Sequence, residues 1–107
     1  MKGVINMNTE KIKFLVMFCL KHDKGSIEEK KFLQDTESIL GPIPGVKNFE
    51  VLRQTSSDID YDFAVAMEFD NKVAYEKFNT YPSHIKYGEQ RWTKEIVRFM
   101  KMEFKDI

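Results

Sequence analysis

One segment, Lys11 to Lys21, constrains the fold more than any other part of the chain. It is dense in β-branched and aromatic residues and bounded by charged ones, which is typical of a β-strand. Successive side chains of a strand point to opposite faces of a sheet. One face would carry Phe14, Val16, Phe18 and Leu20, and the other would carry Leu15, Met17 and Cys19. Because both faces are apolar, we expect both to be covered by protein.

The segment after this strand has the signals of a helix with a defined start and end. Ser26 followed by Glu29 is a capping-box pattern. Apolar residues then recur at helical spacing up to about Leu40, which predicts one face turned toward the core. That predicted face consists of Ile27, Phe32, Leu33, Thr36, Ile39 and Leu40. Residues 41–45 contain two prolines and two glycines and must end the helix.

Two further strands follow, separated by a polar loop over residues 55–60. The first covers residues 46–54, and its charged Glu50 and Arg53 place it near the edge of a sheet. The second, residues 60–70, alternates strictly with period two and is the clearest strand in the chain. Its larger side chains are Tyr61, Phe63, Val65, Met67 and Phe69, with Ala64 and Ala66 between them.

The last third of the chain predicts a broken helical region and a final strand. Asn71 is a suitable cap for a short helix through Phe78, and Pro82 suits the first position of a further helix. That helix reaches about Glu95. In the final strand, residues 96–104, Val97 and Phe99 share one face, and Met100, Met102 and Phe104 require a register that shifts midway.

The predicted order is therefore β, α, β, β, α, β, with the second helical region broken. This order is the ferredoxin-like arrangement of the α+β class, built on an antiparallel sheet. The 107 residues suit one domain. We expect an N-terminal arm at residues 1–10 and a single domain at residues 11–107.

A ferredoxin-like sheet covers one face with its two helices, so the second apolar face needs another cover. Leaving it in water would forgo roughly 1.5 to 3 kcal/mol for each large side chain. A second copy of the chain is the simplest cover, because two-fold dimers are the commonest oligomers. The small Ala64 and Ala66 suit a close approach of two sheets. We therefore expect a homodimer.

The charge pattern excludes several classes of protein. Lys plus Arg and Asp plus Glu each number 17, so the net charge is zero, whereas nucleic-acid binders usually carry a basic excess. The longest apolar run, residues 14–20, is much shorter than the roughly 20 residues of a membrane span. Residues 1–10 hold no apolar stretch typical of a signal peptide. We expect a cytoplasmic protein that binds neither nucleic acid nor membrane.

Motifs for metals and cofactors are missing from the sequence. His22 beside Asp23 offers two potential metal ligands, but no third lies within reach along the sequence. Cys19, the single cysteine, sits in an apolar run and is interpreted as a small buried hydrophobe. No glycine-rich phosphate loop and no Ser/His/Asp signature is present. We expect no metal and no cofactor.

Several short motifs together resemble the stress-responsive A/B barrel (Dabb) family over residues 12–104. They are the opening strand at 14–21, the sequence IPGVK at 43–47 with FEV at 49–51, YDFA at 61–64, MEF at 67–69 and YPSH at 81–84. The resemblance implies a ferredoxin-like domain that pairs as a dimeric α/β barrel. Most members of the family have no known function.

The resemblance also implies where a site would lie. One plant member of the family is a polyketide cyclase, and its catalytic histidine matches His84. Its catalytic tyrosine matches Phe78, which has no hydroxyl to hold an enolate. Two further pocket histidines of the cyclase match Phe14 and Phe63. The candidate pocket residues are therefore Phe14, Phe63, Phe78, Tyr81, His84 and Tyr87, with His84 as the candidate catalytic residue.

Two functions remain open after this comparison. In the first, the dimer binds a small apolar ligand between sheet and helices, and His84 fastens the chain by a hydrogen bond to the backbone or to Tyr87. In the second, the protein is a cofactor-independent enzyme, cyclase-like or monooxygenase-like, that uses His84. The aromatic rings at the matching positions favour the first function over the second.

Overall fold

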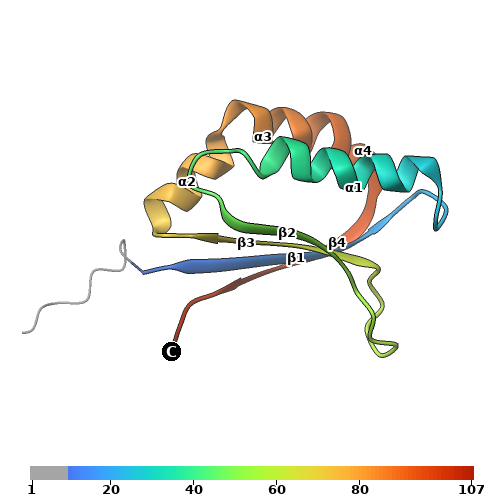
Figure 1. Cartoon of the computed structure of the whole chain (residues 1–107), viewed down its shortest axis with the longest axis horizontal. Helices are drawn as coiled ribbons and strands as arrows, with labels where there is room; N and C mark the ends of the chain where they lie inside the picture. Colours follow the sequence, from blue (N-terminus) through green and yellow to red (C-terminus); the bar gives the residue numbers. More distant parts are fainter. Residues whose placement is uncertain (1–9) are drawn as a thin grey trace, which may run out of the picture.

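The computed structural model describes residues 10–107, so nearly all of the expected N-terminal arm lies outside the described residues. The elements follow the predicted order (Figure 1): β1 (Ile12–Leu20), α1 (Ile27–Leu40), β2 (Lys47–Arg53), β3 (Phe63–Phe69), α2 (Lys72–Thr80), α3 (Pro82–Tyr87), the π-helix η2 (Gly88–Trp92), α4 (Thr93–Glu95) and β4 (Ile96–Phe104). Within residues 10–107, no helix has the length and apolar character needed to span a bilayer.

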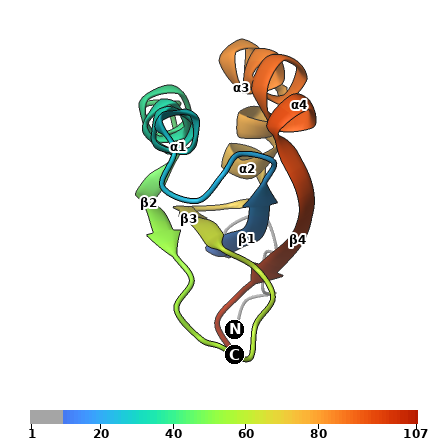
Figure 2. The ribbon, with the colours of Figure 1, turned by 90° about the vertical axis from the view of Figure 1, so that its right-hand side faces the viewer.

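The four strands form one antiparallel sheet in the order β2-β3-β1-β4. β1 and β3 are central, and β2 lies at an edge as its charged residues predicted. All helices pack on one face of the sheet, and no helix covers the other face in the single chain (Figures 1 and 2). The architecture is the α+β ferredoxin-like fold expected from the sequence.

Two predicted strand boundaries are corrected by the sheet. β3 begins at Phe63, not at residue 60, because its ladder with β1 starts at the pair Phe18–Phe63. β4 needs no shift midway, since its pairing with β1 is regular from Arg98 onward, with Phe99 on the helix-facing side and Met100, Met102 and Phe104 on the other. The irregularity lies at its start, where Leu20 pairs with Ile96 while Cys19 pairs with Arg98.

Helix α1 begins as its capping signal predicts, although one core assignment was wrong. The Ser26 hydroxyl accepts from the Glu29 amide at 3.1 Å, and the Glu29 carboxylate accepts from the amide of Gly25 rather than of Ser26. Ile27 is 82% exposed, contrary to the expected helix face. It stands nine residues, or about two and a half turns, from the buried Thr36 and so lies on the opposite face.

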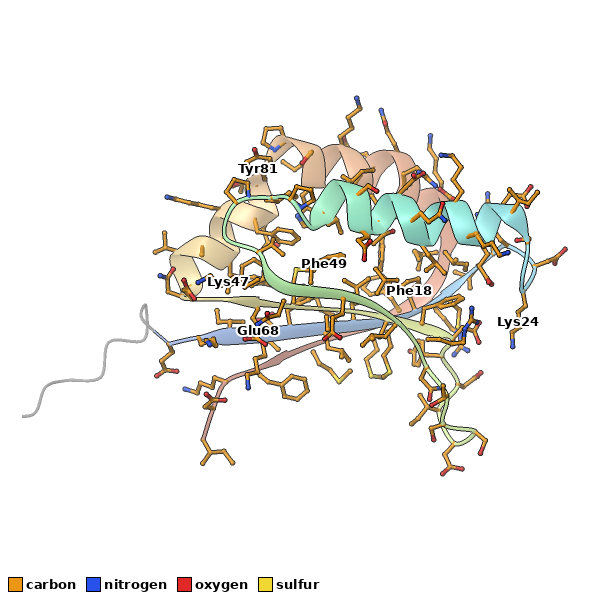
Figure 3. All side chains as sticks on the ribbon, viewed as in Figure 1. Phe18, Lys24, Lys47, Phe49, Glu68 and Tyr81 are labelled. Atoms are coloured by element: carbon orange, nitrogen blue, oxygen red, sulfur yellow. The ribbon has the colours of Figure 1, made fainter. Side chains whose placement is uncertain are left out.

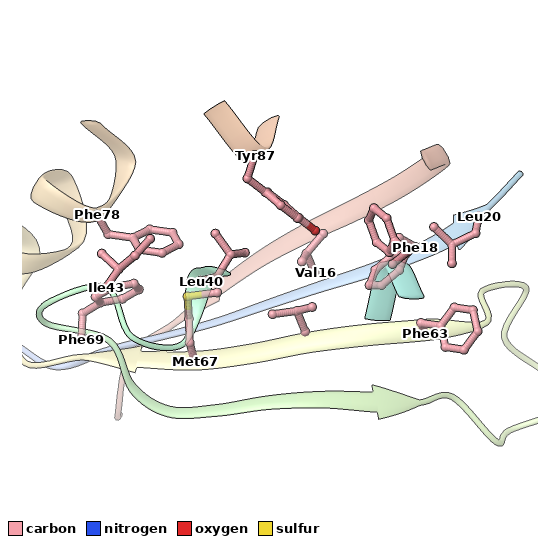
Figure 4. Packing of buried hydrophobic residues seen from close by; sticks show 12 residues of the cluster. Val16, Phe18, Leu20, Leu40, Ile43, Phe63, Met67, Phe69, Phe78 and Tyr87 are labelled. Carbon is pink, nitrogen blue, oxygen red and sulfur yellow. The ribbon is translucent and has the colours of Figure 1, made fainter. Parts of the chain in front are cut away.

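The core between sheet and helices is largely aromatic (Figure 4). Phe18, Phe32 and Phe69 are completely buried, and the Phe18 ring lies 6.0 Å from Phe32 and 5.3 Å from Trp92 between centroids. Such pairs add about 0.5–1.5 kcal/mol to the hydrophobic term. The helices are therefore held to β1 by rings contributed from separate parts of the sequence.

Two polar contacts join α1 to the C-terminal helical region. The Tyr87 hydroxyl lies 2.6 Å from the Thr36 hydroxyl, which itself donates to the Phe32 carbonyl at 2.8 Å. Nearer the surface, Arg91 bonds both Asp35 at 2.6 Å and Glu95 at 2.5 Å. Its hydrogen bond lowers the pKa of Asp35, against the effect of burial.

Removing the buried hydroxyl pair should reveal a coupling between Thr36 and Tyr87. Tyr87→Phe and Thr36→Val should each cost about 1–2 kcal/mol of unfolding free energy, since each leaves a buried polar group without its partner. The double variant should cost less than the sum by about 0.5–1.5 kcal/mol. Denaturant unfolding measures all of these, with exposed Ser38→Ala as the control. Strict additivity would contradict the hydrogen bond.

Candidate functional site

A cavity of about 200 Å³ lies between the sheet and the helices. Its floor comes from β1, β3 and β4, and residues of α1, α2 and the helical segment after Pro82 line its other side. Most of its lining is apolar: Phe14, Val16, Leu40, Val65, Met67 and Phe78. Trp92 and Phe99 add two further rings. Nearly all of the residues that line the cavity are therefore uncharged.

The structure brings four of the six predicted pocket residues to this cavity, namely Phe14, Phe78, His84 and Tyr87. Phe63 does not line it, because it sits at the far end of β3 where the Arg53 guanidinium covers its ring at 5.1 Å. Tyr81 is not part of the lining either. It caps α3 at the surface and is 39% exposed (Figure 3).

His84 is positioned by the break in the helical region. Pro82 opens α3, and the amide of His84 donates to the Tyr81 carbonyl at 3.0 Å. The imidazole Nδ1 lies 2.9 Å from the Phe78 carbonyl, and the two rings stack at 4.2 Å between centroids. Of the two partners expected from the sequence, His84 therefore contacts the backbone and not Tyr87, whose hydroxyl is bonded to Thr36.

This hydrogen bond determines which nitrogen of His84 carries the proton. A carbonyl oxygen can only accept, so Nδ1 must donate, and in the neutral ring Nε2 is left with a free lone pair. Burial lowers the pKa of His84, and the hydrogen bond to the Phe78 carbonyl only partly opposes this. Nε2 has no hydrogen-bond partner among residues 10–107. His84 therefore offers the cavity an acceptor that can also serve as a base.

Two tyrosines line the cavity, Tyr75 and Tyr87, and the hydroxyl of each is already hydrogen-bonded to another side chain. Burial is the main cause that raises the pKa of Tyr87, and its hydroxyl is held by Thr36. The Tyr75 hydroxyl donates to the Glu103 carboxylate at 3.3 Å, and burial likewise raises the pKa of Tyr75. Neither hydroxyl is therefore free to replace the catalytic hydroxyl of the cyclase, whose position is occupied here by Phe78.

Sequence reasoning missed three polar residues of the lining, namely Tyr75, Asn79 and Lys101. Tyr75 precedes Phe78 by three residues on α2, so helical spacing could have placed both on one face. Lys101 lies two residues after Phe99 on β4, so the two side chains share a face of the sheet. This shared face was missed because the strand was expected to shift its register between them.

His22, the residue considered as a metal ligand, belongs to a different contact. Its Nε2 lies 2.6 Å from the Glu95 carboxylate, which also binds Arg91. Burial acts to raise the pKa of Glu95, but the hydrogen bonds from Arg91 and His22 lower it overall. Over residues 10–107, no three side chains of the metal-binding types gather in one place.

The fold and cavity agree with a known family. The profile of the Stress responsive A/B Barrel Domain (Dabb) matches residues 12–106. The chain belongs to this family. A Dabb protein from Mesorhizobium loti with a ferredoxin-like fold is 41% identical, with a TM-score of 0.90 over 92% of this chain and 98% of that one.

More distant structures share the fold with this Dabb chain. A dimeric ferredoxin-like protein of unknown function from Thermobifida fusca is 17% identical, with a TM-score of 0.74 over 99% of this chain and all (100%) of that one. The cofactor-independent oxygenase SnoaB from Streptomyces nogalater is 13% identical, with a TM-score of 0.71 over 91% and 93% of the two chains. No curated protein matches the sequence.

The state of His84 can be measured directly by NMR of its imidazole. We expect the Nδ1–H tautomer at neutral pH and a pKa below the ordinary value of about 6.5. Because the folded pKa is lowered, protonation favours the unfolded chain. The stability that His84 contributes is therefore complete above about pH 6.5 and is lost as the pH falls through its folded pKa.

His84→Ala should cost about 1–3 kcal/mol in unfolding free energy, because it removes a half-buried hydrogen bond and a stacked ring. His22→Ala, which leaves the cavity intact, serves as the control for assigning the imidazole signals. An Nε2–H tautomer, or a His84 pKa above 7, would contradict the geometry.

Proposed function

We propose that this protein is a homodimer that binds a small, mainly apolar molecule in the cavity of each subunit. The observation that carries the proposal is a mostly apolar cavity with one neutral acceptor, His84, in its wall. Binding sites for small molecules commonly combine an apolar lining with a few placed polar groups. We retain the cytoplasm as the proposed location, since the single cysteine is a buried free thiol.

The dimer is supported by the bare face of the sheet, which we call the outer face. The pairing registers place these apolar residues on it: Leu15, Met17, Cys19, Ala64, Ala66, Met100, Met102 and Phe104. In the single chain Met100 is 47% and Phe104 is 53% exposed. Apolar patches of this kind usually mark an interface. The loop after β2 and the C-terminal end extend along the same side (Figures 1 and 2).

Charged residues surround the outer face without interrupting its centre. Lys13 pairs with Glu68 at one end, Glu50 lies on the β2 edge, and Arg98 lies at the other end beside Asp60. An apolar centre with a polar rim is the usual anatomy of a protein interface. The structural neighbour from Thermobifida fusca is itself dimeric, which supports a second copy of this chain as the partner.

A charge placed at the centre of the outer face should break the dimer. Light scattering should give a dimer for the natural chain at micromolar concentration. Ala66→Glu should give a monomer or an unfolded chain, because a carboxylate would enter a dry interface. Lys30→Glu on the exposed side of α1 is the matched control and should remain dimeric. A stable Ala66→Glu dimer, or a monomeric natural chain, would refute the proposed pairing.

The size of the cavity limits its ligand to a small molecule. Drug-sized pockets usually measure roughly 300–1,000 Å³, whereas this cavity measures about 200 Å³. An engineered apolar cavity of about 150 Å³ is known to take up benzene. The ligand should therefore be a single ring or a short chain with few polar atoms.

Binding of a neutral probe tests this part of the proposal. Benzyl alcohol at millimolar concentration should shift the NMR signals of the methyl groups of Val16 and Val65 in the cavity. Val16→Phe should fill the space and abolish the shifts. Ile27→Phe makes a similar change at an exposed site and should leave them intact. Without any shift of cavity signals in the natural chain, the ligand-binding proposal fails.

A second candidate is a cofactor-independent enzyme, cyclase-like or monooxygenase-like, in which His84 acts as the base. The free Nε2 lone pair of a neutral imidazole favours it. It ranks second because Phe14 and Phe78, which match polar residues of the cyclase, carry no hydrogen-bonding group. Turnover of linear polyketides, lost in His84→Ala while that variant stays folded, would reverse this order.

A further inference from the structure

The lining of the cavity includes a positively charged side chain and no negatively charged one. Among its lining residues Lys101 is the one with a formal charge, because His84 is neutral at pH 7 and no carboxylate takes part in the wall. Lys101 is an exposed residue, so its charge lies where the cavity opens to solvent. A ligand that enters therefore meets a positive charge at the mouth of an apolar cavity.

The ammonium of Lys101 also has no ion-pair partner within residues 10–107, whereas its neighbours on the same side of β4 do have contacts. On the helix-facing side, the ring of Phe99 packs 5.6 Å from Trp92 and the Glu103 carboxylate accepts from Tyr75. Within residues 10–107, no carboxylate lies within ion-pair distance of Lys101. Other lysines of the sheet do have partners, such as Lys47 with Asp70 at 2.7 Å. The ammonium of Lys101 is thus available to a ligand.

The charge of Lys101 and the size of the cavity together define a ligand class. A cation in a lining without anions favours a ligand with one negative group and disfavours a cationic one. One compact ammonium suits a single negative charge, whereas a phosphate dianion is usually bound by several donors. A volume of about 200 Å³ leaves room for one ring or a short chain behind the anionic group.

We propose that Lys101 makes the cavity selective for small organic carboxylates, held with the apolar body against Phe14 and Phe78 and the carboxylate at Lys101. This inference rests on the proposed function, namely that the cavity binds a small molecule. It goes beyond that function because it names the ligand class and the residue that sets it. Asn79, the amide in the same lining, offers a second donor to the carboxylate.

The test compares two probes of nearly equal size, benzoate and benzyl alcohol, on the full chain. The natural protein should bind benzoate roughly tenfold more tightly, as one charge-assisted hydrogen bond at the mouth of the cavity allows. Lys101→Met keeps the aliphatic stem but removes the charge, so it should abolish this preference and leave benzyl alcohol binding unchanged. Lys101→Arg should retain it. Added salt should weaken benzoate binding only.

Lys86→Met is the matched control, because it makes the same change at an exposed lysine of α3 that does not line the cavity. Affinities come from NMR titration of cavity methyl signals, and circular dichroism verifies that each variant is folded. Equal affinities for the two probes, with no effect of Lys101→Met, would overturn the carboxylate inference while the binding function stands. Binding of neither probe in the cavity would overturn both.

Discussion

The structure depends on one constraint, the apolar character of β1 on both of its faces. β1 lies between β3 and β4, so every other strand or helix is arranged around it. On one face Val16 and Phe18 are covered by the chain's own helices. On the other, Leu15 and Met17 are only partly buried within the single chain. Burying only one face would leave part of the hydrophobic driving force unused, which is the physical reason for the dimer that we propose.

The same arrangement explains why a cavity exists. The second helical region is broken at Tyr81 and continues as short helical segments rather than as one straight helix. Hydrogen bonds between Thr36 and Tyr87 and between Arg91 and Asp35 hold this region against α1. The space that remains is lined by rings of the core. His84 and Lys101 enter it from a helix and from an edge strand, so each supplies a polar group without loss of core packing.

The helix caps could be predicted from the sequence, whereas the exact start and register of the strands could not. Ser26 and Asn71 are helix caps as predicted, since a cap depends on residues within three positions. The start of β3 and the facing of β4 depend on which strand each one pairs with, and both predictions were wrong. Lys101 was overlooked for that reason. The cavity itself is what packing leaves unfilled, and no local pattern encodes it.

The central claim is that a second copy covers the outer face, and the methionines of that face can test it most directly. Methyl signals of Met17, Met100 and Met102 would be recorded with a soluble nitroxide that broadens exposed groups, with the core residue Met67 as internal reference. Our account predicts that all of them are as protected as Met67, which is 3% exposed. Strong broadening of Met100, which is 47% exposed in the single chain, would contradict it.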